Sequence, residues 1–501
     1  MQTLPTLNDV RSYAQTKRYH RVPLYCELYA DATTPIEVLR HIRSQSSHCF
    51  MLESAEQDAH IGRYTFLGYN PRLCVSAKDG ITTIRKGEET TTYQDRTPAE
   101  VIRSIIAAHR SPRIEGLPPF SGGLMGYFSY SYLATVDDAL TINAPGEEAF
   151  QDVDLMLFDR LIAFDTYRQK IILIAHVDLD AIGDKPDGLE SAYHVAVQEL
   201  GKMRAFVTNH HSEEVSTSGR ITSPIRELMD KETYCDVVRK VQEHIYAGDI
   251  FQAVPSNRLE ANFEGTLLDT YRVLRTINPS PYMFFLSSNQ LELAGASPET
   301  LIRLQDGTLH TYPLAGTRPR GADIAEDRKL EAELLADEKE LAEHNMLVDL
   351  GRNDIGKLST FGSVHVDRHC YIERYSHVMH LCSAISGTIR PEYDAVDAIG
   401  AALPAGTLSG APKIRACQIL DELEGCRRGI YGGAVGYLDF TGNLDMCIAI
   451  RLAYHTGGKV YVRAGAGIVA DSDPESEYEE SRNKARAVVE ALEIAQKGLD
   501  A

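Results

Sequence analysis

Two acidic motifs in the C-terminal half of the chain each carry two glutamates three residues apart, Glu340-x-x-Glu343 and Glu477-x-x-Glu480. Both lie in segments with helical periodicity, and residues at this spacing share one face of a helix. If the two helices converge, four carboxylates repel one another unless a cation lies between them. Mg²⁺ is the expected ion, because it prefers oxygen ligands and keeps positions open for water and an anionic substrate. The same spacing is common on solvated helices, so either motif alone leaves both interpretations open.

Two glycine-containing segments in the same half could bind an anion. The first contains Gly316 and Thr317, which follow a predicted hairpin and can offer backbone and hydroxyl donors. A turn with exposed arginines is the alternative there. The second segment, 406–413, precedes a predicted helix, but Ile414 follows its lysine and its glycines lie too close together for a phosphate-binding loop.

A basic residue and a histidine complete the candidates. A predicted hairpin about Gly457 brings Arg451 roughly opposite Arg463 and near Gly465-Ala466-Gly467, where a guanidinium and approachable backbone amides could cradle a carboxylate. His380 alternates with apolar residues on one face of a predicted strand, and its imidazole could accept a proton near neutral pH. A surface arginine at a β-bulge and a hydrogen-bonded core histidine are the plainer interpretations.

The composition limits the possible partners. Of the 501 residues, 71 are acidic and 51 are basic, and the net charge of -20 argues against binding to nucleic acid or to an anionic membrane. The nine cysteines form no Cys-x-x-Cys motif, no apolar run has membrane-spanning length, and the first residues do not read as a signal peptide. We therefore predict a cytoplasmic protein whose positive charge is concentrated where it binds an anion.

A change in composition predicts two domains. Residues 209–224 are rich in Ser, Thr, Glu and His and lack apolar periodicity, so we place an N-terminal domain at 1–210 and a C-terminal domain at 225–501. Hairpins outnumber strand–helix–strand crossovers, which favours an α+β fold with helices outside antiparallel sheets. The predicted strands and hairpins are 156–165 with 170–177, 301–316, 378–389 and 444–469. The predicted helices are 231–247, 327–349, 411–425 and 475–496.

These segments together resemble the chorismate-utilising enzymes, and within that family most closely the large subunits of anthranilate synthases (component I). The resemblance covers nearly the whole chain and rests on motifs that recur in the family's order: Ala296-Ser297-Pro298-Glu299, 313–321, Glu343-His344, Met379-His380, 406–413, 431–437, 464–467 and 480–485. It implies two intertwined domains, whose antiparallel sheets pack face to face as an α/β sandwich with helices outside. It also implies that residues 1–210 form a tryptophan-sensing regulatory domain and residues 225–501 the chorismate-binding catalytic domain.

The resemblance implies how metal and substrate are held. Mg²⁺ bound by Glu343 and Glu480, with Glu340 and Glu477 acting through water, would bind the ring carboxylate of chorismate. The remaining substrate contacts would be Arg451 and Tyr431 at the enolpyruvyl carboxylate, Gly316, Thr317, Gly465, Ala466 and Gly467 at the ring, and Lys484.

The implied reaction needs an acid and a base. Glu299 would protonate the departing C4 hydroxyl, which requires a raised pKa, and His380 would remove the C2 proton after ammonia has added there. Thr407 and Gln252 complete the implied catalytic set. Gln252 stands where water-adding relatives carry a lysine base, and Ala315 stands where aminodeoxychorismate synthases carry a nucleophilic lysine. Both departures favour direct addition of ammonia.

A regulatory site and a partner are implied as well. Leu52-Glu53-Ser54 and Pro281-Tyr282-Met283 match the family's feedback site for L-tryptophan. There Glu53 would pair with the ligand's ammonium, Ser54 would offer a hydrogen bond, and Met283 would supply an apolar surface. The chain has no Gly-x-Cys-x-Gly glutaminase motif, so its ammonia would come from glutamine through a separate amidotransferase subunit, component II.

The expected activity is the Mg²⁺-dependent conversion of chorismate and ammonia to anthranilate and pyruvate, the first step of tryptophan biosynthesis, with feedback inhibition by tryptophan. Two alternatives stay open. One is an enzyme that makes aminodeoxychorismate or stops at aminodeoxyisochorismate. The other is a non-catalytic amino-acid sensor on the same fold, which would be expected to have lost an acidic ligand or His380, and none of these is missing.

Overall fold

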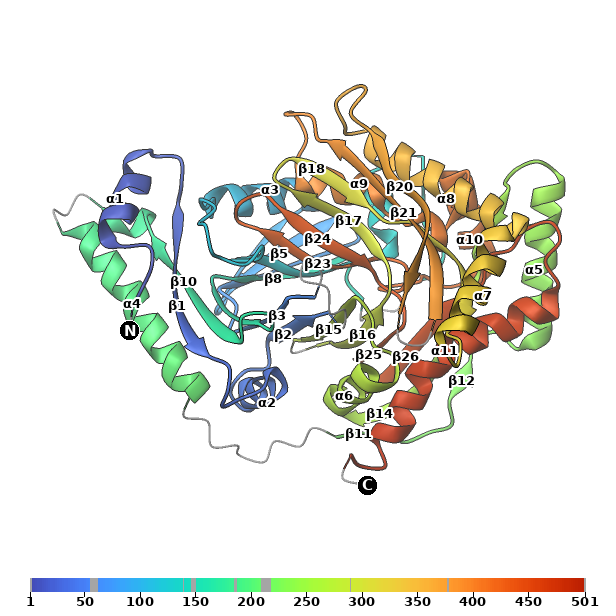
Figure 1. Ribbon diagram of the computed structural model, residues 1–501, viewed down its shortest axis with the longest axis horizontal. Helices are drawn as coiled ribbons and strands as arrows, with labels where there is room; N and C mark the ends of the chain where they lie inside the picture. The colour runs from blue at the N-terminus through green and yellow to red at the C-terminus, as the bar shows by residue number, and fades with distance from the viewer. Residues whose placement is uncertain are drawn as a thin grey trace.

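Two large antiparallel sheets form the centre of the molecule in the computed structural model (Figure 1). The structure describes residues 2–54, 62–137, 139–145, 150–183, 187–208, 218–288, 290–375 and 378–499. The first sheet has the order β1 (Arg21–Tyr29), β10 (Lys170–Asp178), β9 (Arg160–Asp165), β3 (Tyr64–Tyr69), β2 (Cys49–Glu53), β15 (Tyr282–Ser287), β16 (Glu292–Ser297), β25 (Leu452–Thr456), β26 (Lys459–Gly465), β14 (Ser256–Gly265) and β11 (Gly219–Ile221), and β12 (Arg226–Glu227) also pairs with β14.

The second sheet lies against the first. Its order is β19 (Leu314–Pro319), β21 (Val378–Thr388), β18 (Thr308–Thr311), β17 (Thr300–Gln305), β24 (Leu444–Ile448), β23 (Ala434–Asp439), β7 (Gly123–Phe128), β8 (Val153–Phe158), β4 (Leu73–Lys78), β5 (Ile81–Lys86) and β6 (Glu89–Tyr93), and β20 (His365–Arg374) also pairs with β21. A small third sheet pairs β13 (Gln252–Ala253) with β22 (Gly410–Ala411).

Helices cover the outer face of each large sheet (Figure 1). The first sheet carries α1 (Leu7–Gln15), α2 (Pro35–Gln45), α4 (Gly188–Thr208), α6 (Leu268–Ile277) and α11 (Pro474–Ala495). The second sheet carries α3 (Pro98–Ala108), α7 (Ile324–Ala336), α8 (Glu338–Gly356) and α9 (Ala395–Ala402), while α5 (Lys231–Tyr246) and α10 (Lys413–Glu424) pack beside the small sheet. Short 3₁₀ turns occur at Tyr130–Thr135, Asp180–Ile182 and Gly406–Leu408.

The hydrophobic core has three layers, because both faces of both sheets are buried. One layer lies between the first sheet and its helices, one between the second sheet and its helices, and an aromatic-rich layer lies between the sheets. Strand β10 illustrates the cause: Ile171 and Leu173 face the helices, whereas Ile172 and Ile174 face the second sheet. A strand buried on both faces is apolar at every position, which explains its unbroken run of aliphatic residues.

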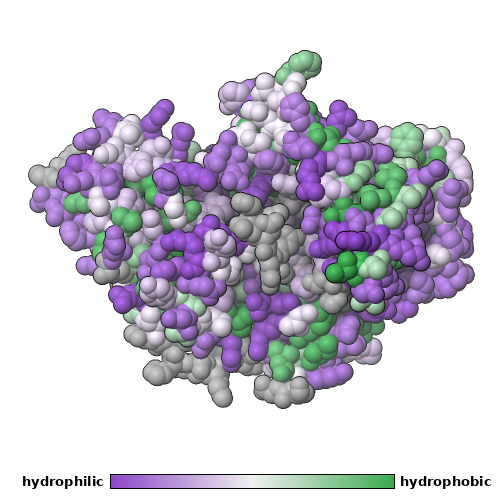
Figure 2. Space-filling model, viewed as in Figure 1, coloured by the Kyte–Doolittle hydropathy of each residue, from purple (hydrophilic) through white to green (hydrophobic). Residues whose placement is uncertain are grey.

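The surface is hydrophilic over most of the face in Figure 2, with apolar residues scattered among polar ones. This distribution fits a chain whose apolar residues are largely taken up by the three core layers. Within the part of the chain that the structure describes, none of the helices combines the length and the apolar character that crossing a bilayer requires.

The two halves of the sequence share both large sheets. In the first sheet β2 pairs with β15, and in the second β7 pairs with β23, so each sheet continues from N-terminal into C-terminal strands. The predicted fold class, α+β with face-to-face antiparallel sheets and helices outside, is confirmed. The predicted boundary falls largely on residues 209–217, outside the described residues, and the limits 1–210 and 225–501 stay a prediction.

Three predicted elements were wrong in extent. The strand predicted at 156–165 is two strands, since β8 ends at Phe158 in the second sheet and β9 begins at Arg160 in the first. The hairpin predicted at 444–469 is only β25 and β26, because β24 belongs to the second sheet. The helix predicted at 327–349 is interrupted at Asp337, whose carboxylate accepts hydrogen bonds from the amides of Lys339 and Glu340 and thereby caps α8.

A fully buried ion network joins the small sheet to the first large sheet. Glu424 accepts hydrogen bonds from Arg428 (2.6 and 2.9 Å), Arg463 (2.8 Å) and the Ser256 amide (2.7 Å), and the two guanidinium side chains and the carboxylate are at most 2% exposed. Arg428 also donates to the carbonyl of Val254 at 2.6 Å. Arg463 is therefore a structural residue and does not stand beside Arg451 as a second anion-binding guanidinium.

We expect Glu424→Gln to lower the free energy of unfolding by about 3 to 5 kcal/mol, because it leaves two buried guanidinium groups without their counter-charge. Urea denaturation of wild type and variant measures the difference. The matched control is Glu264→Gln, which breaks a pair with Arg220 whose side chains are both 71% exposed, and which should change stability negligibly. Equal small losses in both variants would contradict the structural role of the network.

Candidate active site

The two acidic motifs lie on helices α8 and α11, whose charges lie within electrostatic range of each other. Burial raises the pKa of Glu343 on α8, and Lys484 of α11 opposes that rise. Burial likewise raises the pKa of Glu477 on α11, and Lys339 of α8 opposes it. Each motif thus lies within electrostatic range of a lysine on the other helix, and a cation shared by the four glutamates stays a prediction.

One glutamate of each motif already has a cationic partner; these two, Glu340 and Glu480, are called the outer glutamates, and Glu343 and Glu477 the inner ones. Glu340 lies 3.5 Å from Arg318, and Glu480 lies 2.8 Å from Lys484. Among the described residues, no three His, Cys, Asp or Glu side chains stand close enough together to hold a metal ion. The arrangement thus differs from four bare carboxylates, because internal cations balance two of them.

The inner glutamates nevertheless fit a hard cation. Glu477 Oε2 is buried and has no hydrogen-bond partner among the described residues, and the only side-chain hydrogen bond recorded for Glu343 comes from Gln252 Nε2 at 3.2 Å. Buried carboxylate oxygens without donors are unfavourable unless a cation reaches them. A divalent ion held by few protein ligands, with water and substrate completing its shell, suits such a site. The Mg²⁺ assignment stays a prediction.

His380 is oriented as a neutral base. It lies on β21 opposite Thr317, with Nδ1 3.0 Å from the Gly316 carbonyl oxygen and 3.1 Å from Thr317 Oγ1. A carbonyl oxygen only accepts, so Nδ1 carries the proton and Nε2 carries the lone pair. Nε2 has no partner among the described residues. Burial lowers the pKa of His380 to about 4, and the imidazole is therefore uncharged near neutral pH.

Glu299 is held as a neutral acid just before β17. Its side chain is buried, and Thr407 Oγ1 lies 3.2 and 3.3 Å from its two carboxyl oxygens. Burial raises the pKa of Glu299 to about 8, although Thr407 and Arg451 oppose the rise. A carboxyl group in this state can donate a proton at neutral pH.

Arg451 lies where the chain passes from the second sheet into the first, and its backbone is left-handed with φ of 50°. Its guanidinium makes no hydrogen bond or ion pair with any described residue, although burial lowers its pKa. A desolvated cation without a counter-ion would bind an anionic ligand group strongly. Tyr431 is 4% exposed and lies beside Arg428 of the buried ion network, with the guanidinium 6.0 Å from its ring centroid, and burial raises its pKa to about 12.

Two glycines bring backbone close to the acidic helices. At Gly316, with φ of 59°, a Cβ would lie 2.9 Å from Leu334 and 3.0 Å from Glu340 Oε2. At Gly467 a Cβ would lie 2.6 Å from Gln252 Nε2. A side chain at either position would displace the groups around it, which explains the glycines there. Gly465 and Ala466 are buried, with Gly465 at the end of β26.

Comparison with known proteins decides the family. The family model described as chorismate binding enzyme matches residues 47–490. Anthranilate synthase component 1 of Acetivibrio thermocellus is 42% identical over 98% of this chain and 99% of its own length, and that of Acinetobacter calcoaceticus is 41% identical over 97% and 98%. The crystal structure of anthranilate synthase component I from Streptococcus pneumoniae TIGR4 superposes with a TM-score of 0.73 at 33% identity, over 92% of this chain and 98% of that one.

The chain belongs to the chorismate binding enzyme family. The candidate acid Glu299, the candidate base His380 and Arg451 are therefore considered as side chains of a chorismate binding enzyme. The structure brings His380, Gly316 and Thr317 into direct contact, and likewise Glu299 with Thr407 and Gln252 with Glu343. Lys484, predicted as a substrate contact, forms an ion pair with Glu480.

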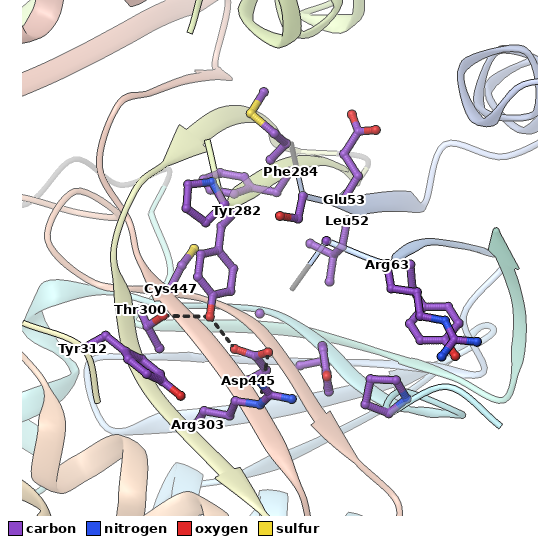
Figure 3. Close-up of a pocket in the computed structure, with 18 of the residues that line it drawn as sticks. Leu52, Glu53, Arg63, Tyr282, Phe284, Thr300, Arg303, Tyr312, Asp445 and Cys447 are labelled. Atoms are coloured by element: carbon purple, nitrogen blue, oxygen red, sulfur yellow. Dashed lines mark hydrogen bonds and ion pairs between the residues drawn. The ribbon is translucent and has the colours of Figure 1, made fainter. Parts of the chain in front are cut away.

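A cavity of about 430 Å³ lies between the two sheets and is lined by all five predicted regulatory residues, Glu53, Ser54, Pro281, Tyr282 and Met283 (Figure 3). Two of these side chains are engaged elsewhere. The Glu53 carboxylate accepts hydrogen bonds from Tyr271 at 2.6 Å and from Arg275 Nη2 at 2.9 Å on α6. Met283 is 2% exposed and packs in the core layer under the helices. Tyr282 points into the cavity instead (Figure 3).

Several residues at these sites were missed from the sequence. Tyr375 places its ring centroid 5.5 Å from that of His380 and also lines the cavity. Asp445 and Arg303 line the cavity on neighbouring strands. The available signal was a single charged residue within an apolar strand, as in Leu444-Asp445-Met446-Cys447-Ile448. The local sequence does not show which strand pairs with the strand of Asp445.

We expect Thr407→Val to raise the pKa of Glu299 above its value of about 8, because the Thr407 hydroxyl stabilises the ionised carboxylate and thus lowers that pKa. Infrared titration from about pH 6 to about pH 10 follows the protonated carboxyl band, and Glu299→Gln identifies which band belongs to it. Thr441→Val removes a buried hydroxyl elsewhere and serves as the control. A Glu299 pKa that stays the same or falls in Thr407→Val would contradict the assignment.

Proposed function

We propose that this enzyme converts chorismate and ammonia to anthranilate and pyruvate with bound Mg²⁺, the first step of tryptophan biosynthesis. The observation that carries the proposal is a neutral acid, Glu299 with a pKa of about 8, and a neutral base, His380 with a pKa of about 4, both within electrostatic range of Arg451. Nε2 of His380 has no hydrogen-bond partner among the described residues. Relatives named anthranilate synthase component 1, about 40% identical over nearly the full length, support it.

The proposed reaction uses these groups in two steps. Glu299 donates a proton to the C4 hydroxyl, which leaves as water as the ring double bonds shift and the nitrogen of ammonia bonds to C2. An ammonium proton is lost to solvent, which leaves an amine. His380 Nε2 then takes the C2 proton, and the bond from C3 to the enolpyruvyl oxygen breaks as the ring becomes aromatic. The leaving group is the enolate of pyruvate, which gains a proton from solvent at its methylene carbon, while His380 returns its proton to solvent. Arg451 would hold the enolpyruvyl carboxylate throughout, because its guanidinium has no partner among the described residues.

Gln252 and Ala315 favour amination over the addition of water and over formation of a covalent adduct with the enzyme. Gln252 cannot deprotonate water, and its Nε2 donates to Glu343. Ala315 on β19 cannot form a covalent adduct with the ring. Ammonia needs neither group, since its own lone pair attacks. We propose that a separate glutamine amidotransferase subunit supplies it in the cytoplasm.

The proposed metal would be held by Glu343 and Glu480, with Glu340 and Glu477 acting through water, once Glu340 and Glu480 give up their contacts with Arg318 and Lys484. Mg²⁺ would supply charge neutralisation for the ring carboxylate of chorismate. The chain's own contribution is to present desolvated oxygens, one of them without a donor.

Feedback by tryptophan is proposed at the cavity between the sheets. Its volume of about 430 Å³ suits an aromatic amino acid, and the segments 52–54 and 281–283 both line it. Inhibition requires that tryptophan bind a less active arrangement of the chain more tightly than the active one. By linkage, chorismate must then weaken tryptophan binding by the same factor.

Incubation with chorismate, Mg²⁺ and ammonium at alkaline pH, followed by anthranilate fluorescence and mass identification of the product, tests the proposal. Anthranilate with stoichiometric pyruvate is the expected result. An accumulated aminodeoxychorismate, or no turnover at all, would refute it.

We expect His380→Gln to lower anthranilate formation by roughly 10²- to 10⁴-fold while the aminated intermediate accumulates, because only the second step needs a base at C2. Chromatography with mass detection of quenched reactions measures both species. The control is His369→Gln, which changes an exposed histidine that contacts Asn345. If His380→Gln makes neither species and no longer binds chorismate, the residue has another role.

Metal binding is expected to weaken by roughly 10-fold or more in Glu343→Gln and in Glu480→Gln, because each loses a carboxylate charge while keeping its shape. Calorimetric Mg²⁺ titration without substrate gives a readout independent of turnover. Glu475→Gln, on the same helix as Glu480 but paired with Lys231 at 2.7 Å, is the control. Unchanged Mg²⁺ titrations in both variants would contradict the metal assignment.

A further inference from the structure

The lysine that ends the segment 406–413, Lys413, has no part in the proposed chemistry. It is the first residue of α10, and its Nζ donates to Asp354 Oδ2 on α8 at 2.8 Å and to the carbonyl oxygen of Ala402, the last residue of α9, at 3.1 Å. The side chains of Lys413 and Asp354 are 10% and 13% exposed. One shielded ammonium group thus joins three helices.

The Ala402 carbonyl stands at the start of the loop that carries Thr407. The last carbonyls of a helix have no partner within that helix, and a cation that binds one of them fixes the position from which the chain continues. At the other end of the loop, Arg428 donates to the carbonyl oxygen of Leu408, the residue after Thr407. Two cations, Lys413 and Arg428, therefore hold residues 403–407 from both ends.

Packing leaves this loop some room to move. On one side it touches α8 closely, because a Cβ at Gly406 would lie 2.7 Å from Leu350. Beside it lies a cavity of about 40 Å³ whose lining includes Glu299, Asp354, Ala402 and Thr407. A loop that borders a cavity can shift without a clash, since the close packing of a protein interior is interrupted there. Its hydrogen bonds must then set its position.

The contact between Thr407 and Glu299 is sensitive to such a shift. Thr407 Oγ1 lies 3.2 and 3.3 Å from the two carboxyl oxygens, which is already long for a hydrogen bond between oxygens. Burial raises the pKa of Glu299 to about 8, and the Thr407 hydroxyl is the first of the groups that oppose this rise. A small displacement of the loop would therefore make Glu299 a weaker acid.

We propose that Lys413 and Asp354 are positioning residues for the acid Glu299. Asp354 orients the ammonium group, the ammonium group fixes the Ala402 carbonyl, and the loop then keeps Thr407 Oγ1 on the carboxyl group. The inference rests on the proposed function, in which Glu299 protonates the C4 hydroxyl. Without this support Thr407 withdraws, the pKa of Glu299 rises further, and the proton is donated less readily.

The double variant Asp354→Leu with Lys413→Met separates positioning from a merely structural ion pair. It keeps the net charge and leaves no unpaired ion, and apolar side chains of similar size can replace a shielded ion pair without loss of the fold. The Ala402 carbonyl nevertheless loses its donor. We expect the variant to fold, as urea denaturation will show. In infrared titration the pKa of Glu299 should rise, as in Thr407→Val and by no more than in that variant.

The control makes the same exchange in a similarly shielded ion pair on β14, Arg258→Met with Glu260→Leu. These two side chains lie 3.0 Å apart and are 10% and 16% exposed. Because they do not hold the Thr407 loop, the pKa of Glu299 should stay at its wild-type value.

Thr407→Val provides the background that identifies the route. If Lys413 and Asp354 act through the Thr407 hydroxyl, their double exchange adds no further rise to the pKa of Glu299 once that hydroxyl is gone. An unchanged pKa in the wild-type background, or an equal rise in both backgrounds, would overturn the inference.

Lys413→Met alone decides if the double variant does not fold, because Lys357 lies 3.5 Å from Asp354 and still balances its charge. The direct electrostatic effect of the lost ammonium is the same with and without the Thr407 hydroxyl. Only a rise that is larger in the wild-type background supports positioning through Thr407, and equal rises contradict it.

The pH dependence of turnover gives a second measurement. Glu299 acts while protonated, so kcat/KM at a constant concentration of un-ionised ammonia should fall as pH rises through its pKa. This fall should occur at higher pH in the double variant than in wild type and in the control, and an unshifted fall contradicts the inference. A wild type that makes no anthranilate would refute the proposed function, whereas the infrared titrations of the free protein still decide whether Lys413 and Asp354 position Thr407.

Discussion

Loss of water around a few ionisable groups sets the protonation states on which the proposed chemistry depends. Burial alone acts in opposite directions on an acid and a base: it raises the pKa of Glu299 to about 8 and lowers that of His380 to about 4. Below its ordinary pKa of 4.5, Glu299 is protonated in the folded and the unfolded chain, and its ionisation costs nothing. As pH rises from 4.5 toward 8 the carboxyl ionises in the unfolded chain but stays protonated in the folded one, so at pH 7 its burial costs about 3 kcal/mol. His380 is neutral in both folded and unfolded chain at pH 7 and costs nothing there; its burial destabilises the fold only as pH falls below 6.5 toward 4. The fold therefore bears a cost to keep an acid protonated where the proposed reaction needs one.

The buried network around Glu424 keeps that arrangement in register. Arg428 donates to the carbonyls of Val254 and Leu408, the residues that follow β13 and Thr407 respectively. One guanidinium thus ties together the loop that carries Gln252 and the loop that carries the Thr407 contact to Glu299. A carboxylate between two guanidinium groups is no more stabilising than a well-packed apolar cluster would be, but its directional bonds fix positions that apolar packing leaves freer. The network can thus fix the geometry of the candidate site, and its desolvation is the energetic cost.

Sequence reasoning succeeded where the signal was local and failed where sheet partners were decided over long distances. The helices carrying the acidic motifs, the strand of His380 and the hairpin turn at Gly457 and Gly458 follow from periodicity and turn residues. The division of 156–165 between two sheets does not, because apolar residues occupy both faces of β8 and β9 and give no alternation to read. At the regulatory site the resemblance named Glu53 and Met283, which are cross-strand partners on β2 and β15 and both line the cavity between the sheets. Their part in ligand binding stays a prediction. Asp445 and Arg303 become neighbours only through the pairing of β17 with β24.

Several folding requirements are unmet at the candidate active site. Arg451 combines a left-handed backbone, which a side chain adopts at a cost of the order of 1 kcal/mol, with a guanidinium that has no partner among the described residues. Gln252 Oε1, His380 Nε2 and Glu477 Oε2 are buried and have no hydrogen-bond partner within the described part of the chain. Each of these features opposes folding. A substrate with two carboxylates, bound with a divalent cation, would satisfy the arginine and the carboxylate oxygens at once, so the strain and the missing partners are what the folded chain contributes to binding.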